Sequence, residues 1–412
     1  VASEVNTAAN PVVLSVKDEP INDPAILSII KNDPEQIEKD ASGNVVKKAI
    51  SGVKFKICYY DVDVMSTLSL DDLGDRIPTR TWVLRTDDNG YVALGKKWKV
   101  DGSDEFYFIE GNSQPVVPLG VLTLEEIETD PRYVLDPTVR FVRVTESMAD
   151  NNEVIKFSDT TLVNDSIDYP NVETKTEITK KDITGQEEVV GAALKVVDKD
   201  GTVMDEWVST DEPRIIRGLT VGETYTLIET KPAPGWTTAE SIDFTILAGG
   251  EVTKVTMRDD ITKYSFIKVD ENDEPLSGAT LRLEEASEGT FIEEWVTNDE
   301  PYVIVGKLEV GKTYKLIEVN SPDGYYRAEA IEFTVTDDNE MHVIKMKDPL
   351  TITEITKKSI TTQNELPGAK LVVTDKNGNV VKDGEWISTN EAHTIKGLTV
   401  GETYTLTETI KS

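Results

Sequence analysis

The chain has 412 residues, with 76 Asp and Glu side chains against 43 Lys and Arg, and a formal net charge of -33 at pH 7. This length favours three or four domains over one, and the charge excludes nucleic acids and anionic membranes as partners, because both bind basic surfaces. A single cysteine, Cys58, excludes an internal disulfide framework.

No apolar run reaches the ~18 residues of a membrane-spanning helix, and no basic segment followed by an apolar one indicates a signal peptide. The sequence begins at Val1 rather than Met and ends at Ser412 inside a repeated unit. We interpret it as part of a longer polypeptide.

The N-terminal part predicts one isolated strand and one enlarged unit. Residues 1–20 alternate apolar and polar side chains and predict a strand ending in an inward-facing Asp18, the trailing strand of a preceding, absent unit. Residues 24–166 form the enlarged unit. Its extra length comes from turn-rich insertions at Ser66–Arg80 and Gly90–Val117.

Three polar residues of this first unit fall on the inner faces of its predicted strands. The opening strand PAILSIIKND places Lys31 on the same face as its apolar residues. The strand GVLTLEEIE does the same with Glu126, although Glu125 competes for this place, and TTLVND closes the unit with an inward-facing Asn164.

Three copies of one motif then set the organisation of the chain. The segment EWVSTDEPRIIRGLTVGETYTLIET begins at Glu206, and related segments begin at Glu294 and Glu385. A period of about 90 residues, with turn residues between short apolar runs, indicates a tandem array of small all-β domains. Within TYTLIE, alternation places Leu227 and Glu229 on one face, so a carboxyl group shares the core face of a strand.

Residues 173–260 and 262–348 are compact copies, and residues 351–412 repeat the opening strands without the closing ones. Linkers of only a few residues predict a stiff, elongated array. Each compact copy has an inward Lys on its first strand, an inward Glu on a middle strand and an inward Asp on its last strand. These residues are Lys180, Glu229 and Asp259, and Lys268, Glu318 and Asp348; the incomplete copy offers only Lys357 and Glu408.

The repeated placement of these charged side chains on core faces indicates that they can react with one another. Burying an isolated charge costs several kcal/mol, and desolvation raises a carboxyl pKa and lowers an amine pKa. A buried Lys–Asp–Glu cluster can therefore hold a neutral amine against a protonated acid, with the Glu moving protons. Loss of water from an Asp pair, or of ammonia from an Asn pair, leaves an amide between the side chains. The alternatives are an ordinary buried ion pair, or a Lys whose amine reaches the surface.

At this point the residues carry a resemblance to a known family. The segments IKVDENDEPLSGATLRLEE, TYKLIEVNSPDGYY, IEFTV and HVIKMKD resemble the Cna B-type, or SpaA-like, domains of Gram-positive surface adhesins and pilins. The resemblance implies tandem antiparallel β-sandwiches of Ig-like or prealbumin-like fold. It also implies an isopeptide bond between a first-strand Lys and a last-strand Asn or Asp, promoted by a buried Glu.

Carried onto this sequence, the resemblance implies three bonds: Lys31–Asn164 with Glu126, Lys180–Asp259 with Glu229, and Lys268–Asp348 with Glu318. Lys357, Glu408 and Asp18 are unpaired equivalents of these residues. The bonds would form once and not turn over, so we expect no enzyme, no cofactor and no metal.

The expected function is a structural stalk or shaft segment of a secreted, cell-wall-attached adhesin or pilus-like protein, monomeric as isolated. The alternative is a binding module, in which the insertions of residues 24–166 bind a host extracellular-matrix protein or a glycan.

Other motifs are interpreted structurally. We expect Trp207, Trp295 and Trp386 in the cores, and Cys58 as a buried thiol. We expect TDDNG and DKDG to form hairpin turns rather than calcium loops. The tripeptide YPN, ending at Asn171, resembles a pilin motif used by sortases, but Asn replaces the reactive Lys, so we interpret it as a linker. His342 and His393 lack the neighbours of a catalytic triad or metal site.

Overall fold

The structure, a computed structural model, describes residues 22–23, 26–40, 42–62, 69–108, 113–150 and 153–411. The strand predicted in residues 1–20, with Asp18, lies outside them. This described part is nearly all β, and its two helices, α1 (Leu70–Leu73) and α2 (Glu146–Asp150), are about one turn each. None of its helices has the length and apolarity needed to cross a membrane.

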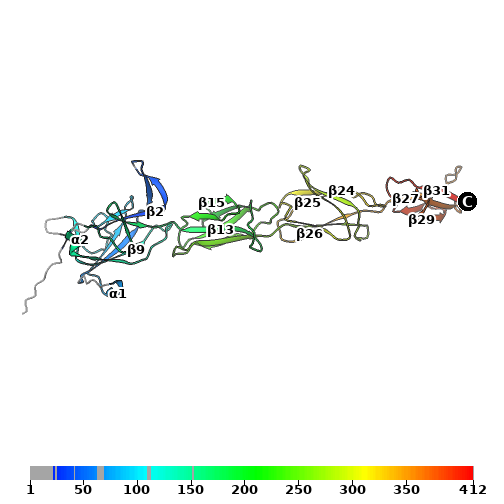
Figure 1. The fold of residues 1–412 in the computed structure, drawn as a ribbon. Helices are drawn as coiled ribbons and strands as arrows, with labels where there is room; N and C mark the ends of the chain where they lie inside the picture. Colours follow the sequence, from blue (N-terminus) through cyan, green and yellow to red (C-terminus); the bar gives the residue numbers. More distant parts are fainter. Residues whose placement is uncertain are drawn as a thin grey trace, which may run out of the picture. The chain divides into compact units, whose positions relative to one another are not determined.

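The enlarged first unit is built from three sheets, with strand orders β10-β9-β4-β5, β11-β12-β2-β3 and β1-β8-β7; β6 also pairs with β2. β2 and β3 project from the unit as a hairpin (Figure 1). The strands are β1 (Asn22–Asp23), β2 (Ser28–Lys39), β3 (Val45–Ala49), β4 (Lys54–Tyr60), β5 (Arg80–Arg85), β6 (Tyr91–Ala93), β7 (Tyr107–Phe108), β8 (Pro115–Pro118), β9 (Gly120–Glu128), β10 (Arg140–Val144), β11 (Thr161–Val163) and β12 (Ser166–Pro170).

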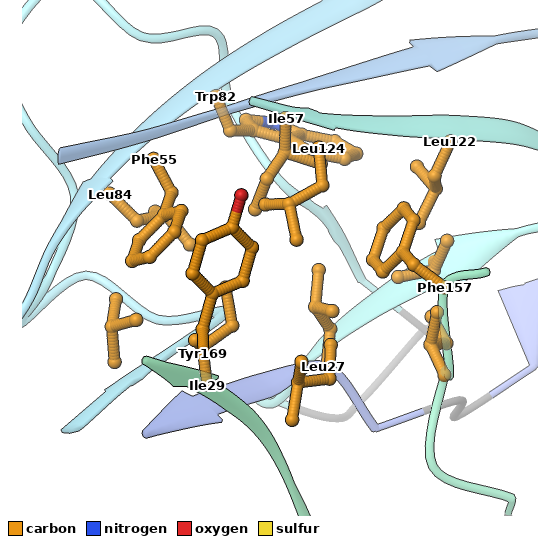
Figure 2. Close-up of a cluster of buried hydrophobic side chains, with 14 of the residues drawn as sticks. Leu27, Ile29, Phe55, Ile57, Trp82, Leu84, Leu122, Leu124, Phe157 and Tyr169 are labelled. Carbon is orange, nitrogen blue, oxygen red and sulfur yellow. The ribbon is translucent and has the colours of Figure 1, made fainter. Parts of the chain in front are cut away.

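The core of the first unit is formed by apolar side chains from the inner faces of these strands. Figure 2 shows Ile29 of β2, Leu124 of β9, Trp82 of β5 and Tyr169 of β12 converging in one cluster. Side chains two positions apart on a strand share a face. Lys31, two residues after Ile29, is therefore also directed inward and is 0% exposed.

Two compact sandwiches follow. The second unit has sheets β16-β13-β19 and β15-β14-β17-β18, and the third has sheets β23-β20-β26 and β22-β21-β24-β25. The strands are β13 (Lys175–Asp182), β14 (Ala193–Val197), β15 (Val203–Val208), β16 (Arg214–Arg217), β17 (Thr224–Lys231), β18 (Ile242–Thr245), β19 (Thr253–Asp259), β20 (Lys263–Val269), β21 (Thr280–Glu285), β22 (Phe291–Val296), β23 (Tyr302–Val305), β24 (Thr313–Asn320), β25 (Ile331–Thr334) and β26 (Met341–Lys347).

The fourth unit contains the counterparts of the opening strands, in sheets β27-β30 and β29-β28-β31. Among the described residues, no strand pairs with β27 other than β30. The strands are β27 (Ile352–Ile355), β28 (Lys370–Thr374), β29 (Val380–Ile387), β30 (His393–Lys396) and β31 (Thr405–Ile410).

The predicted class, tandem all-β sandwiches, is confirmed, but in two units the first and last strands do not pair in the expected antiparallel arrangement. In the third unit, β20 and β26 run parallel, with Lys268 in register with Met346. In the first unit, β2 and β12 run parallel, with Lys31 in register with Tyr169. The first and last strands of these units are thus neighbours, which brings residues far apart in the sequence to the same Lys.

The closing strand of the first unit is not the predicted one. The TTLVND segment forms β11, which pairs with β12 and has no place beside β2. Asn164 and Asp165 make the tight turn between β11 and β12, at φ values of 49° and 57°. It is β12 that lies beside β2, so the last strand of the unit extends past the predicted boundary at residue 166.

The Trp residues, Cys58 and the two Asp-rich segments, for which we expected structural roles, lie mostly where the sequence predicts. Trp295 is 8% exposed and belongs to the third core, whereas Trp207 and Trp386 are only half-buried. Cys58 is buried. The DKDG segment is a hairpin turn between the paired strands β14 and β15. The TDDNG segment is a tight turn, but the strands that it joins, β5 and β6, lie in different sheets. In these turns Asp198 and Asp87 accept backbone N–H bonds.

Candidate functional site

The third sandwich buries a lysine and two carboxyl groups in one cluster. Lys268 lies on β20, Glu318 on β24, and Asp348 directly after β26, and all three side chains are 0% exposed. The Lys268 Nζ contacts Asp348 Oδ1 and lies 3.1 Å from Glu318 Oε1. The backbone N–H of Ala328 donates to Glu318 Oε2 at 2.5 Å and fixes this carboxyl. The structure thus brings these three predicted residues together.

The second sandwich repeats the arrangement. Lys180 of β13 contacts Asp259 Oδ1 of β19, and its Nζ lies 3.1 Å from Glu229 Oε1 of β17. The N–H of Ala239, ten residues after the Glu, donates to Glu229 Oε2 at 2.6 Å. The same strand positions and the same backbone donor therefore build both clusters.

Burial controls the protonation of these clusters. Desolvation disfavours a charged carboxylate and raises the pKa of Asp259 to about 7, against the opposing effect of Lys180. Burial likewise raises the pKa of Glu318. Glu318 Oε1 and Asp348 Oδ2 are buried and have no hydrogen bond of normal geometry within the described residues. Adjacent buried carboxyl groups disfavour carrying two negative charges at once.

In the first unit, the acyl side chain that belongs to the buried cluster is not the predicted one. The Lys31 Nζ donates to Glu126 Oε2 at 2.8 Å, and both side chains are 0% exposed. The other carboxyl oxygen, Glu126 Oε1, accepts a 2.7 Å hydrogen bond from Asn171 Nδ2. One carboxyl thus bridges the amine of Lys31 and the carboxamide of Asn171.

The prediction that Asn164 is the partner of Lys31 is wrong in this structure. Asn164 is exposed in the β11–β12 turn, whereas Asn171 is 4% exposed. The backbone of Asn171 also makes a hydrogen bond that fixes its place beside the first strand. Its N–H donates to the carbonyl of Asn32, the residue after Lys31, at 3.0 Å.

The third unit has the equivalent backbone bond. The N–H of Asp348 donates to the carbonyl of Val269, the residue after Lys268, also at 3.0 Å. Asn171 and Asp348 therefore occupy the same place relative to the first strand.

A sequence signal for Asn171 was present. Ile167, Tyr169 and Asn171 alternate as the last strand of a unit does, ending on an acyl side chain. The interpretation of the YPN tripeptide as a linker is wrong, because Tyr169 and Pro170 belong to β12 and Asn171 is buried directly after it. Thr129, which contacts the Asn171 carboxamide, had no signal, because it follows the predicted Glu strand in a polar segment.

The electrostatics of the first site make the neutral form of the amine easier to reach than at an exposed lysine. Burial lowers the pKa of Lys31 to about 8, although the neighbouring Glu126 carboxylate opposes this shift. Burial also raises the pKa of Glu126, which Lys31, Asn171 and the backbone amide of Asp136 oppose. The Lys31 Nζ lies 4.5 Å from the centre of the Tyr169 ring, which shields it from water.

The fourth unit brings its two predicted equivalents together in a more open setting. The Lys357 Nζ lies 3.1 Å from Glu408 Oε2, and each side chain is 29% exposed. No group of three or more His, Cys, Asp or Glu in the described residues could hold a metal ion.

Comparison with known proteins places the compact and incomplete units in one family. The SpaA family, described as a prealbumin-like fold domain, matches residues 174–261, 262–349 and 351–411, more than half of the chain. No curated protein matches the chain.

Several solved structures are similar at low identity. The Bacillus anthracis TIE protein is 18% identical, with a TM-score of 0.35, and the match covers 79% of this chain and 51% of that one. A streptococcal ancillary pilin is 15% identical, with a TM-score of 0.32, covering 79% and 98%. The shaft pilin SpaA of Lactobacillus rhamnosus GG is 15% identical, with a TM-score of 0.23, covering 43% and 98%.

This chain spans about half of the TIE protein structure. The family match rests on the sequence of the three units themselves, which repeat one after another along the chain. The chain belongs to the SpaA family of prealbumin-like fold domains.

Proposed function

We propose that this chain is a shaft or stalk segment of a cell-surface pilin or adhesin, in which each complete unit is braced by a Lys–acyl isopeptide bond. The bonds join Lys180 to Asp259, Lys268 to Asp348, and Lys31 to Asn171. The observation that carries the proposal is the contact of Lys180 and Lys268, each buried in the core of its sandwich, with the acid at the end of the last strand.

The chemistry balances without a further reactant. In a compact unit, the neutral Lys amine attacks the carboxyl carbon of the protonated Asp, an amide bond forms, and one water leaves. The adjacent Glu accepts the amine proton and supplies a proton to the departing oxygen. Holding the two groups in contact replaces a collision between separate molecules, which is worth roughly 10⁵–10⁸ M in effective concentration. Each bond forms once, so the chain is not an enzyme in this proposal.

The strand arrangement gives the bond a mechanical role. In the third unit, the bond would tie the first strand, β20, to the end of its parallel neighbour, β26. A pull on these two strands would then act on a covalent link instead of on hydrogen bonds that unzip one by one. The bond also supplies bracing in an extracellular, cell-wall-attached setting, where a chain with one cysteine has no disulfide of its own.

The two kinds of bond are expected to form with opposite pH dependence. The Asp259 pKa of about 7 means that this acid is protonated, and open to attack, mainly below pH 7. Formation of the Lys180–Asp259 bond should therefore slow as the pH rises through 7. The Lys31 pKa of about 8 means that its amine becomes neutral above that pH, so formation of the Lys31–Asn171 bond should accelerate there.

Newly synthesised chain, sampled over time at several pH values and digested, would give both rates from the cross-linked peptides. Equal pH profiles at the two sites would contradict the assigned acid and amide chemistry.

Stretching single molecules of the full chain tests the structural role. Lys180 and Asp259 are 79 residues apart, and Lys268 and Asp348 are 80 apart. An extended chain spans about 3.3–3.6 Å per residue. The chain between two bonded residues cannot be stretched, so each bond should shorten the fully extended molecule by on the order of 270 Å. Lys180→Ala should release that length for the second unit alone. Full extension of the unaltered chain would refute the proposal.

A second candidate function has one observation in its favour. The Gly90–Val117 insertion carries a hollow of about 410 Å³ beside Trp98, and charged groups of both signs surround it: Arg85, Lys97, Lys99, Asp87 and Asp101. An aromatic ring among polar groups of both signs suits a glycan. Screening the full chain on a glycan array, with Trp98→Ala as the control, tests this. Equal binding by both proteins, or none, would exclude the site.

A further inference from the structure

The first site differs from the other two in the chemistry of its leaving group. Its acyl residue is an amide, Asn171, so bond formation must expel ammonia instead of water. An amide nitrogen is a poor leaving group until it receives a proton. A residue that controls this nitrogen would therefore affect the first site and have no equivalent task at the Asp sites. This inference rests on the proposed function.

Two oxygen atoms hold the Asn171 nitrogen. Nδ2 donates one hydrogen bond to Glu126 Oε1 at 2.7 Å and another to Thr129 Oγ1 at 3.2 Å. The two N–H groups of a carboxamide lie in one plane and point in different directions. Both are engaged here, so the orientation of the carboxamide is fixed with its nitrogen, and not its oxygen, toward Glu126.

The compact units have no matching contact. Thr129 stands three residues after Glu126, where the second and third units have Pro232 and Ser321. Pro232 has no hydroxyl, and no hydrogen bond joins Ser321 to Asp348 in the described part of the chain. The hydrogen bond from a side chain at this position to the acyl group is therefore found in the unit with an Asn acceptor and not in the two units with an Asp acceptor.

We propose that Thr129 orients the leaving nitrogen of Asn171, so that Glu126 delivers a proton to that nitrogen as the Lys31–Asn171 bond forms. The neutral Lys31 Nζ attacks the Asn171 Cγ, and Glu126 Oε2 accepts a proton from Nζ. The Glu126 carboxyl, now protonated on Oε2, turns about its Cγ–Cδ bond and donates this proton to Nδ2. The Cγ–Nδ2 bond breaks, one ammonia leaves, and Glu126 returns to its starting protonation state.

The role of Thr129 in this step is geometric. As Nδ2 becomes an amine in the tetrahedral intermediate, its lone pair must face Glu126 to receive the proton. The second N–H, held by Thr129 Oγ1, stops rotation of the nitrogen away from this direction. Without the hydroxyl, the carboxamide can also turn its oxygen toward a protonated Glu126, and this orientation does not assist departure of the nitrogen.

The test compares rates of bond formation in full-length chains made by cell-free synthesis, acid-quenched at intervals and digested. Thr129→Val removes the hydroxyl with little change of shape and should slow the appearance of the Lys31–Asn171 peptide about tenfold, the effect of one lost hydrogen bond. Thr129→Ser should restore the rate. The Lys180–Asp259 and Lys268–Asp348 peptides in the same samples report whether synthesis and folding proceed normally.

A second pair of variants separates this role from a purely structural one. In Asn171→Asp, the acceptor loses water and has no leaving nitrogen to orient. Adding Thr129→Val to Asn171→Asp should therefore change the rate less than about twofold. Equal slowing in both backgrounds, or no slowing in the Asn background, would overturn the inference. If the unaltered chain forms no Lys31–Asn171 peptide at all, the proposed function itself fails for this unit, and that result differs from any Thr129 effect.

Discussion

Replacing Lys268 by Met is expected to lower the free energy for opening the third sandwich by about 4–5 kcal/mol, the chain-entropy contribution of a covalent link closing a loop of ~80 residues. Lys268 and Asp348 are 80 residues apart. The Met side chain fills the same buried space without an amine, so the bond cannot form. Hydrogen exchange of peptides from residues 262–349 in the full chain would measure the local opening free energy.

A control for this variant lies on the same sandwich. Lys315→Met, on β24, makes the same substitution at a surface lysine whose Nζ lies 3.5 Å from Glu332 Oε1. An exposed ion pair of this kind contributes less than about 1 kcal/mol. If Lys268→Met changes the opening free energy no more than Lys315→Met does, the third unit has no covalent brace.

Removing the side chain of Asn171 is expected to abolish the bond of the first unit, whereas removing that of Asn164 should leave it intact. Asn171→Ala deletes the carboxamide that Glu126 holds beside Lys31. It also removes the covalent link between the first and last strands of the unit, so the unit should be destabilised by several kcal/mol. Asn164→Ala alters only an exposed turn. Digestion and mass analysis of cross-linked peptides would distinguish the two variants.

The opposite result for these two variants would contradict the assignment of Asn171 as the acceptor. A Lys31 cross-link that persists in Asn171→Ala and disappears in Asn164→Ala would restore the partner expected from sequence. It would also mean that β11, and not β12, closes the sheet beside β2. Because the positive φ of Asn164 disfavours a residue with a Cβ, Asn164→Gly serves as a second control that keeps the turn.

Strand alternation was enough to predict the two compact sites. Lys268 and Glu318 share a strand face with buried apolar neighbours, and so does Asp348, two residues after Met346. The period of two along a strand decides the inner face wherever one side of a sheet is buried. Repetition in two units made the pattern readable, since one misassigned strand would not recur at the same positions.

Alternation could not choose between two candidate closing strands in the first unit. Leu162 with Asn164, and Tyr169 with Asn171, have the same spacing of an apolar and an amide side chain. The choice depends on which strand pairs with β2, a long-range contact that spacing within one strand does not encode. The backbone prefers the tight turn at Asn164 and Asp165, because Asn and Asp tolerate positive φ better than other residues with a Cβ.

The hydrogen bonds inside each site could also not be predicted from the alternation of side chains along the strands. The backbone N–H groups of Ala239 and Ala328 fix the two Glu side chains. Both donors lie in the segments that follow the Glu strands, where side-chain identity says little about the direction of the N–H. Thr129 reaches Asn171 from the corresponding segment of the first unit.

The intact mass of the purified chain is the most direct test of the central claim. Three bonds, two formed with loss of water and one with loss of ammonia, predict a mass about 53 Da below that of the sequence. Lys180→Ala should return about 18 Da of this deficit, after correction for the substitution itself. A chain that weighs what its sequence dictates would contradict the account, and the buried lysines would then be ion pairs and not covalent braces.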